Sequence, residues 1–251
     1  MVKSQLRLLA RCVKNMNDKK EFKLPTGIPG VIGFKDFSDK LRDQSVKGIL
    51  FLRHAERPPL EKDDPTFGAA LGITDNGVKM TQSCGKILGS IEGCVFGATP
   101  MRRTHETARV LADSMGYSGA NIFDAPEAGV AGIYAENFAE IHKGYEREGA
   151  IPFTDKYLNT GTASGYVPLK EGTRRICKWL TETDFGGRCT VIVSHDIFIA
   201  AILRSLDVGI FDSENWIGFL QAAAFINDKS NMWKVYYCVP DMLNYQTKFY
   251  S

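Results

Sequence analysis

Basic side chains follow directly behind one apolar stretch of this 251-residue sequence. In "ILFLRHAERPP" the apolar residues 49–52 precede Arg53, His54 and Arg57. A guanidinium can hold two oxygens of a phosphate at once, and a neutral imidazole can act as a nucleophile. These three side chains therefore predict an anion site with a nucleophile in it, provided that the fold holds them together.

The segments that must position these residues alternate between strand-like and helix-like patterns. Short unbroken apolar runs are typical of strands buried on both faces of a parallel sheet. We expect strands at 48–52, 94–98, 121–125 and 190–194, helices at 73–91, 103–116, 171–183 and 197–207, and a β-hairpin over 219–239. This order predicts an α/β fold, a three-layer α/β/α sandwich with a mainly parallel sheet and a C-terminal β-hairpin.

In such sheets ligands bind beyond the carboxyl ends of the strands. The polar residues at or just after the carboxyl ends of the four expected strands are Arg53, His54 and Arg57; Thr99, Arg102 and Arg103; Asp124 and Glu127; and Ser194, His195 and Asp196. Together they predict a cationic cup for a phosphoryl group, with an imidazole as nucleophile and a carboxylic acid to protonate a leaving oxygen.

Four motifs in this order carry a resemblance to a known family. "RHAERPP", "ITDNG", "TPMRRTHETA" and "SHD" resemble the histidine phosphatase superfamily, which includes phosphoglycerate mutases and histidine acid phosphatases. The resemblance spans about residues 46–239 and implies a phosphoglycerate mutase-like fold. Because several separate matches occur in the family's order, this signal is more specific than any single short motif.

The resemblance implies a role for each matched residue. His54 would be the nucleophile that becomes phosphohistidine, and the phosphoryl group would be held by His195 together with Arg53, Arg57 and Arg103. Resemblance to the acid phosphatase branch implies that Asp196 is the proton donor. Resemblance to the mutase branch implies that Glu127 is. We place Asp196 first. Ala55 stands where the family usually has glycine, and its methyl group is tolerated only if its backbone φ is negative.

Other candidate residues favour structural roles. His105 and His142 lie outside the matched motifs, Arg102 is expected at the surface, and Glu56 is expected to pair with one of the arginines. The four histidines show no metal-ligand spacing, so we expect no metal and no cofactor.

Composition limits the class of protein. A formal net charge of +2 does not favour nucleic acid or a membrane surface as partner. No apolar run has the length of a membrane span, and six scattered cysteines favour a reducing, cytoplasmic location. We expect residues 1–45 to be an N-terminal extension packed on a catalytic domain at 46–251, with 129–170 as an insertion or lid and a basic helix in 1–17. The oligomeric state is not predicted.

The sequence thus predicts a metal-independent phosphomonoesterase that works through phosphohistidine on His54. A phosphomutase with the same intermediate and a catalytically weak phosphate-binding protein are the alternatives. The substrate, a phosphorylated small molecule or phosphopeptide, would be selected by residues 60–72 and 129–170.

Overall fold

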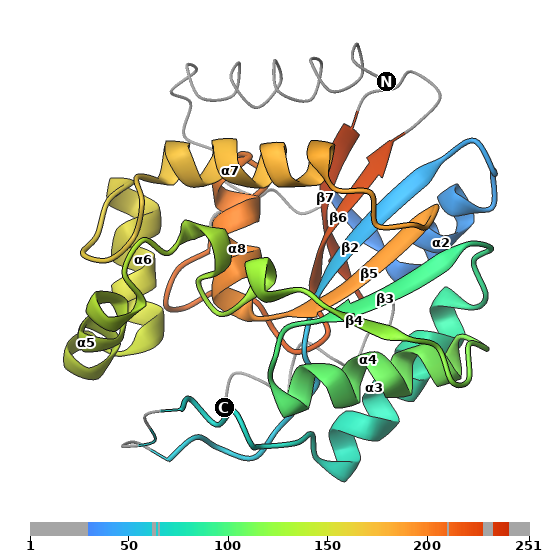
Figure 1. The fold of residues 1–251 in the computed structure, drawn as a ribbon, viewed down its shortest axis with the longest axis horizontal. Helices are drawn as coiled ribbons and strands as arrows, with labels where there is room; N and C mark the ends of the chain where they lie inside the picture. Colours follow the sequence, from blue (N-terminus) through green and yellow to red (C-terminus); the bar gives the residue numbers. More distant parts are fainter. Residues whose placement is uncertain (1–29, 62–63, 65, 210, 228–232, 241–251) are drawn as a thin grey trace.

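A seven-stranded sheet forms the centre of the molecule, with helices on both faces (Figure 1). The computed structural model describes residues 30–61, 64, 66–209, 211–227 and 233–240. In chain order the elements are β1 (Val31–Gly33), α2 (Phe34–Leu41), β2 (Lys47–Arg53), α3 (Asp75–Leu88), β3 (Cys94–Ala98), α4 (Arg102–Ser114), β4 (Ile122–Asp124), η1 (Pro126–Ala128), η2 (Gly132–Tyr134), α5 (Phe138–Glu148), α6 (Ala150–Thr160), α7 (Leu169–Glu182), β5 (Cys189–Ser194), α8 (Asp196–Ser205), β6 (Ala222–Asn227) and β7 (Trp233–Val239).

The strand order is β1-β7-β6-β2-β5-β3-β4. Strands β2, β5, β3 and β4 are parallel to one another, and β6 is antiparallel to both β2 and β7. The predicted mainly parallel sheet and the C-terminal hairpin are therefore confirmed. The expected turn of that hairpin lies outside the described residues.

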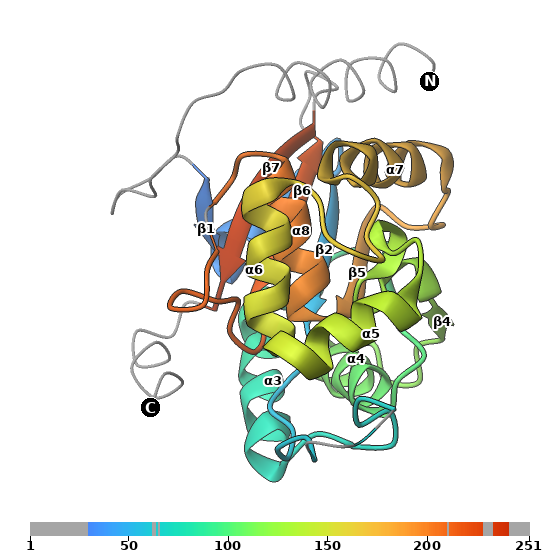
Figure 2. The same cartoon turned by 90° about the vertical axis from the view of Figure 1, so that its left-hand side faces the viewer.

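Each face of the sheet has its own hydrophobic core. In β2, Ile49 and Phe51 face the core beneath α5–α8, whereas Leu50 and Leu52 face the core beneath α2–α4. Side chains alternate between the two faces of a strand, so an unbroken apolar run fills both cores at once. Figures 1 and 2 show the two helical layers on either side of the strands.

The segment before β2 is more regular than its Pro- and Gly-rich sequence predicts. Residues 31–33 form β1, which pairs in parallel with β7. The following helix, α2, was not predicted, although Phe34, Phe37 and Leu41 on it are fully buried. The basic helix expected in residues 1–17 lies outside the described residues.

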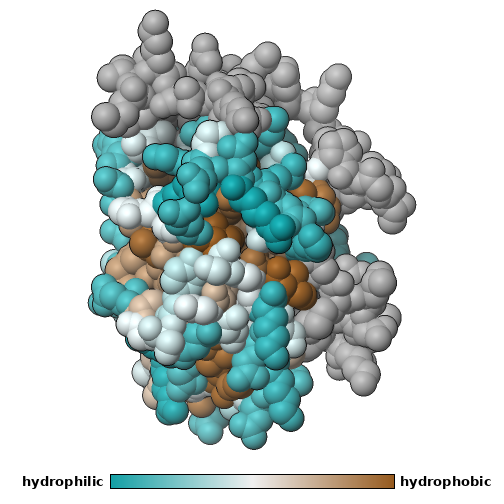
Figure 3. Space-filling model, turned by 90° about the vertical axis from the view of Figure 1, so that its right-hand side faces the viewer, coloured by the Kyte–Doolittle hydropathy of each residue, from teal (hydrophilic) through white to brown (hydrophobic). Residues whose placement is uncertain are grey.

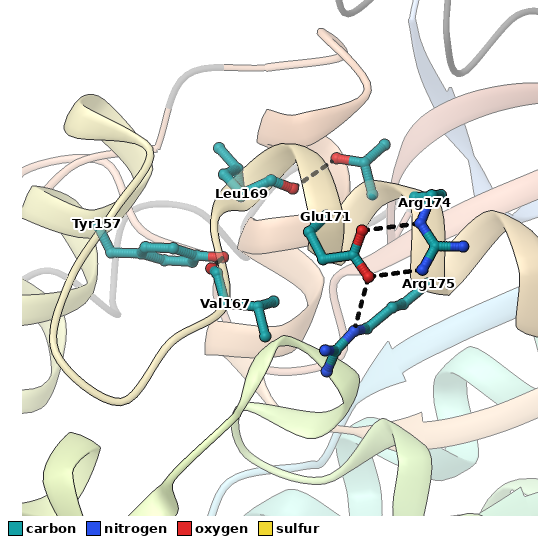
Figure 4. Close-up of polar contacts among 7 residues, drawn as sticks. Tyr157, Val167, Leu169, Glu171, Arg174 and Arg175 are labelled. Carbon is teal, nitrogen blue, oxygen red and sulfur yellow. Dashed lines mark hydrogen bonds and ion pairs between the residues drawn. The ribbon is translucent and has the colours of Figure 1, made fainter.

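The segment 129–170, which has the weakest sequence pattern, contains η2, α5 and α6. On α6, the Tyr157 hydroxyl donates to the carbonyl of Val167, in the loop that leads into α7, at 2.9 Å (Figure 4). On the first turns of α7 the Glu171 carboxylate accepts hydrogen bonds from Arg174 and Arg175. The first contact ties α6 to the loop before α7, and the contacts of Glu171 lie within α7.

The amino-terminal ends of the strands form the end of the molecule seen in Figure 3, where hydrophobic surface appears as separate patches among hydrophilic ones. A cavity of about 340 Å³ lies there, lined among others by Lys47, Asp184 and Trp233. Lys47 begins β2 and Arg53 ends it, so roughly 20 Å of strand separates this cavity from the opposite edge. Among the residues that the structure describes, no helix is long and apolar enough to cross a membrane.

Candidate active site

The loop after β2 is fixed to two other segments at the carboxyl edge of the sheet. The backbone N–H of His54 donates to the carbonyl of Ser194 at 3.0 Å. The N–H of Ala55 donates to the Thr107 hydroxyl at 3.0 Å, and that hydroxyl donates to the carbonyl of Arg103 at 2.7 Å. These bonds join the ends of β2 and β5 to α4, so the three motifs that are distant in sequence meet at one place.

His54 is buried, with 3% of its surface exposed. Its Nδ1 lies 2.8 Å from the carbonyl oxygen of Ala55. A carbonyl only accepts hydrogen bonds, so Nδ1 carries the proton of the neutral ring and Nε2 keeps its lone pair. Burial lowers the pKa of His54 well below its usual value, and the nearby charges of His195, Arg53 and Arg103 lower it further. The ring is therefore neutral at pH 7.

His195 lies beside His54, with 5.5 Å between the ring centroids. Its Nε2 is 2.9 Å from the Thr99 hydroxyl. The Thr104 hydroxyl donates to the carbonyls of Thr99 and Met101, so the Thr99 hydroxyl donates to Thr104 and accepts from His195. Burial, followed by the charge of Arg103, lowers the pKa of His195 to about 3.

Arg53 is held on three sides. Its guanidinium forms an ion pair with Asp196 at 2.9 Å and donates to the carbonyl of Ile217. The same group lies 4.3 Å from the centroid of the Phe219 ring, a cation–π geometry. These contacts fix the direction in which the remaining guanidinium N–H groups point.

Arg103 and Arg57 complete the cationic cup. Arg103 is 3% exposed, and its Nη1 donates to the carbonyls of Phe67 and Gly68 at 3.2 and 2.8 Å. Burial and the charge of Arg57 lower the pKa of Arg103 to about 10. The Nε atoms of Arg53, Arg57 and Arg103 are all buried without a hydrogen-bond partner. Three unsatisfied buried donors in one cup are costly unless an anion binds them.

Two helices begin at the same edge. α4 starts at Arg102, and α8 starts at Asp196 with His195 as its N-cap residue. The first N–H groups of a helix lack partners within the helix, and the helix dipole is positive at that end. Both helices therefore add to the attraction that the arginines exert on a phosphate.

The two candidate acids have different surroundings. Burial raises the pKa of Asp196, but the charges of Arg53 and His195 outweigh this and hold it below its usual value. Glu127 lies on η1 with an exposed side chain, and the described residues give its carboxylate no hydrogen bond or ion pair. The Ser194 hydroxyl donates to the carbonyl of Ala128 at 2.6 Å, which fixes η1 beside the end of β5.

The sequence analysis expected Glu56 to pair with an arginine, but the structure gives it other partners. Its carboxylate accepts from the Thr74 hydroxyl at 2.8 Å and from the Asn76 amide at 2.6 Å. Thr74 also accepts from the N–H of Gly77 and is the N-cap of α3. A Cβ at Gly77 would lie 2.5 Å from the carbonyl oxygen of Glu56. The "ITDNG" motif therefore lets α3 approach the backbone of the loop that carries His54.

Ala55 is fully buried and belongs to the core beneath α2–α4. It is absent from the described non-glycine residues with positive φ, which are Phe67, Asp207 and Leu220. The backbone at Ala55 therefore accommodates a methyl group where the family usually has glycine.

The remaining polar residues lie apart from the cup. His105 pairs with Asp124 at 3.3 Å, and Arg102 pairs with Glu106 at 2.6 Å along the exposed side of α4. His142 lies on α5, with its Nδ1 3.6 Å from Glu146. Among the described residues, no three His, Cys, Asp or Glu side chains form a group that could hold a metal ion.

Sequence reasoning missed the partners that come from loops. Phe219 lies against both Arg53 and His54, and the carbonyls of Phe67 and Gly68 hold Arg103. A backbone carbonyl leaves no trace in the residue type, and an aromatic residue before a strand resembles any core residue. Only the fold brings these groups to the site.

The structure thus brings a buried neutral histidine and three arginines together at the carboxyl edge of the sheet, where the sequence predicted a phosphoryl-binding site. The sequence model described as histidine phosphatase superfamily (branch 1) matches residues 49–223. The chain belongs to this superfamily. A comparison with curated protein sequences finds no match.

Solved structures share the fold at low sequence identity. Mycobacterial hydrolase 2 is 12% identical with a TM-score of 0.51, and the alignment covers 79% of this chain and 94% of that one. A mycobacterial glucosyl-3-phosphoglycerate phosphatase is 14% identical with a TM-score of 0.49, covering 78% and 99%. A phosphoglycerate mutase from Bacillus anthracis is 14% identical with a TM-score of 0.48, covering 77% and 92%.

Proposed function

We propose that this protein is a phosphomonoesterase that forms phosphohistidine on His54 during turnover. The observation that carries the proposal is the set of three buried guanidinium Nε donors without partners, next to a histidine whose Nδ1 is already hydrogen-bonded. Guanidinium donors suit the oxygens of a phosphoryl group, and the lone pair on Nε2 would supply the nucleophile. The sequence predicted the same residues from their positions at strand ends and from the resemblance to the histidine phosphatase superfamily.

In the first step Nε2 of His54 attacks phosphorus, a nitrogen–phosphorus bond forms, and the phosphorus–oxygen bond to the leaving alcohol breaks. Arg53, Arg57 and Arg103 neutralise the charge that spreads over the phosphoryl oxygens. In the second step water attacks phosphohistidine, phosphate leaves, and neutral His54 is restored. The carboxylate that gave its proton to the alcohol accepts one from this water.

The surroundings of the two acids favour Glu127 as the proton donor, which reverses the order expected from the sequence. Asp196 is in an ion pair with Arg53 and its pKa is lowered, so protonating it would break that pair. Its role in this proposal is to orient Arg53. Glu127 is exposed on η1 and has no cation as a partner in the described part of the chain, so it can take up and release a proton without breaking an ion pair.

A phosphomutase would use the same phosphohistidine to pass the phosphoryl group to a second hydroxyl. The superfamily to which the chain belongs contains both phosphatases and mutases, so membership alone does not separate the two reactions. The mutase requires a bisphosphorylated primer to maintain its phosphoenzyme, and hydrolysis does not. The catalytically weak binding protein of the sequence prediction would bind phosphate and form no phosphoenzyme.

The proposal is tested by assaying the purified protein against a panel of phosphorylated metabolites and phosphopeptides in the presence of EDTA. Release of inorganic phosphate without primer supports the phosphomonoesterase. Isomer formation that depends on a bisphosphate supports the mutase, and phosphate binding without turnover of any ester contradicts both enzymes. EDTA also tests the predicted independence from metal ions.

Location and partners stay predictions. Among the described residues, Cys84, Cys94, Cys189 and Cys238 are not disulfide-bonded, in keeping with the reducing cytoplasm predicted from the sequence. We expect a phosphorylated small molecule or phosphopeptide as the partner and no nucleic acid.

A further inference from the structure

Exposed apolar side chains are concentrated beside the arginine cup. Among the described residues, only Leu60 and Phe138 are large hydrophobic side chains with a high exposed fraction, at 37% and 42%. Leu60 packs against the position of Gly68, and the Phe138 ring lies 5.8 Å from the Phe67 ring. Phe67 and Gly68 are the residues whose carbonyls hold Arg103. Both exposed side chains are thus one contact away from a phosphate-binding arginine.

Phe67 connects the cup to α5. Its ring contacts Phe138, His142 and Tyr145 edge to face, with centroids 4.5–5.9 Å apart. Its φ of 53° is unusual for a bulky residue, so packing of the ring on α5 must hold this conformation while the carbonyl faces Arg103. Figure 2 shows α5 lying beside the segment that follows β2. We call Phe67, Phe138 and His142, together with the neighbouring apolar Leu60, the aromatic wall.

The charges near the aromatic wall do not favour a second anionic group on the substrate. Asp64 accepts hydrogen bonds from Thr66 and Gly68, and its negative charge acts on Arg103. Glu146 lies near His142. Within the described residues of α5, Lys143 and Arg147 are already paired with Glu140 and Glu148.

We infer that the aromatic wall is the leaving-group subsite, and that the substrate is the phosphate monoester of an uncharged aromatic or apolar alcohol. This inference rests on the proposed function, because the wall has this role only if the cup binds the phosphoryl group. An apolar leaving group covers the exposed Leu60 and Phe138 side chains, whereas a carboxylate or second phosphate on the substrate meets Asp64 and Glu146.

The test compares binding of 1-naphthylmethylphosphonate and methylphosphonate by calorimetry, because phosphonates are not hydrolysed. We expect the wild-type protein to bind the naphthyl compound at least tenfold more tightly, as burial of part of an aromatic ring predicts. Phe138→Ala and Leu60→Ala should each reduce this preference several-fold and leave methylphosphonate binding within twofold of wild type. Lys143→Ala, on the same helix but paired with Glu140, is the matched control and should change neither affinity.

Equal affinity for the two phosphonates in the wild type overturns the inference, and so does a preference that both variants retain in full. These outcomes are independent of turnover. If naphthyl-selective binding is found while no ester in the assay panel is hydrolysed, the subsite stands and the proposed catalytic function fails.

Discussion

At the scale of single residues, the chemistry depends on two histidines whose ring nitrogens have defined partners. The Ala55 carbonyl fixes Nδ1 of His54, and the Thr99 hydroxyl fixes Nε2 of His195. The sequence identified both histidines, because each lies within a multi-residue motif at a strand end. It did not predict which ring nitrogen of each is occupied, since the partners are a carbonyl and a chain of hydroxyls that only the folded backbone brings into range.

The lowered pKa of His54 leads to a prediction for the pH dependence of activity. The nucleophile must be neutral, and its pKa in the folded protein lies below 6.5. The neutral form therefore stays dominant as the pH falls from 7 to 6.5, and activity is lost only when the pH passes through the lowered pKa. We expect kcat/KM for p-nitrophenyl phosphate, corrected for ionisation of the substrate, to have its acid limb below pH 6.5. An acid limb centred above pH 6.5 contradicts this environment for His54.

The roles proposed for Glu127 and Asp196 predict different dependence on the leaving group. A good leaving group such as p-nitrophenolate needs little protonation, whereas an alkyl alcohol needs a full proton. Glu127→Gln should therefore lower kcat by about 100-fold for an alkyl phosphate and by less than about tenfold for p-nitrophenyl phosphate. Asp196→Asn releases Arg53 and should impair both substrates similarly. If the two variants show the reverse pattern, Asp196 is the proton donor.

At the scale of the elements, the contact between α3 and the loop after β2 is the most demanding feature of the site. Helix α3 begins where the Thr74 side chain caps it, and Gly77 on its first turn lies against the backbone of Glu56. The N-cap was predictable from the sequence. The close approach was not, because a glycine in a helical pattern indicates nothing about which segment packs against it.

This contact predicts that Gly77→Ala reduces both stability and activity. The new Cβ would lie 2.5 Å from a backbone carbonyl oxygen, which no side-chain rotation can relieve. We expect a loss of about 1–3 kcal/mol in the free energy of unfolding and a lower kcat, because the loop that holds His54 must shift. Urea denaturation and steady-state kinetics measure the two effects. Ser83→Ala on the exposed side of the same helix is the control, and equal behaviour of the two variants would refute the close contact.

Prediction of elements from sequence succeeded where hydrophobic patterns were strong. Strand β3 was predicted with its observed bounds, and β5 was predicted one residue short. The strand β1 has only three residues and its apolar side chains are half-buried, so its pattern could not stand out. Helices α5 and α6 were left as a possible helical insertion because their buried positions are mostly aromatic, threonine or glycine rather than aliphatic.

At the scale of the whole molecule, the parallel sheet brings the ends of β2, β3, β4 and β5 to one edge, where the motifs meet. The existence of this edge was predictable, because the carboxyl ends of parallel strands lie together. The strand order and the pairing of β1 with β7 were not predictable from the sequence, because they depend on contacts between distant segments. In this account, catalysis requires β2, β3, β4 and β5 to pair in the observed register, because that register places their ends, and the motifs that follow them, side by side.

Two buried neutral histidines make the stability of the folded protein depend on pH. The pKa of His195 is about 3 in the folded state, and that of His54 is also well below the usual 6.5. The unfolded chain therefore binds more protons below pH 6.5, so stability present above that pH is lost as the pH falls toward 3. We expect about 1 kcal/mol lost per histidine between pH 7.5 and 5.5.

Urea denaturation at the two pH values measures this loss. The variant His195→Asn has one buried histidine fewer and should lose correspondingly less stability between them. If the wild type and the variant lose the same amount, His195 is not buried in its neutral form.

The central claim is that His54 becomes phosphorylated during turnover. The direct measurement is rapid-quench mass spectrometry of the protein mixed with p-nitrophenyl phosphate, with wild type and His54→Ala compared. We predict a phosphoramidate on the peptide that contains His54, formed and hydrolysed at least as fast as kcat, and its absence along with turnover in His54→Ala. Steady turnover by the wild type with no phosphate on His54, or undiminished turnover by His54→Ala, would contradict the account.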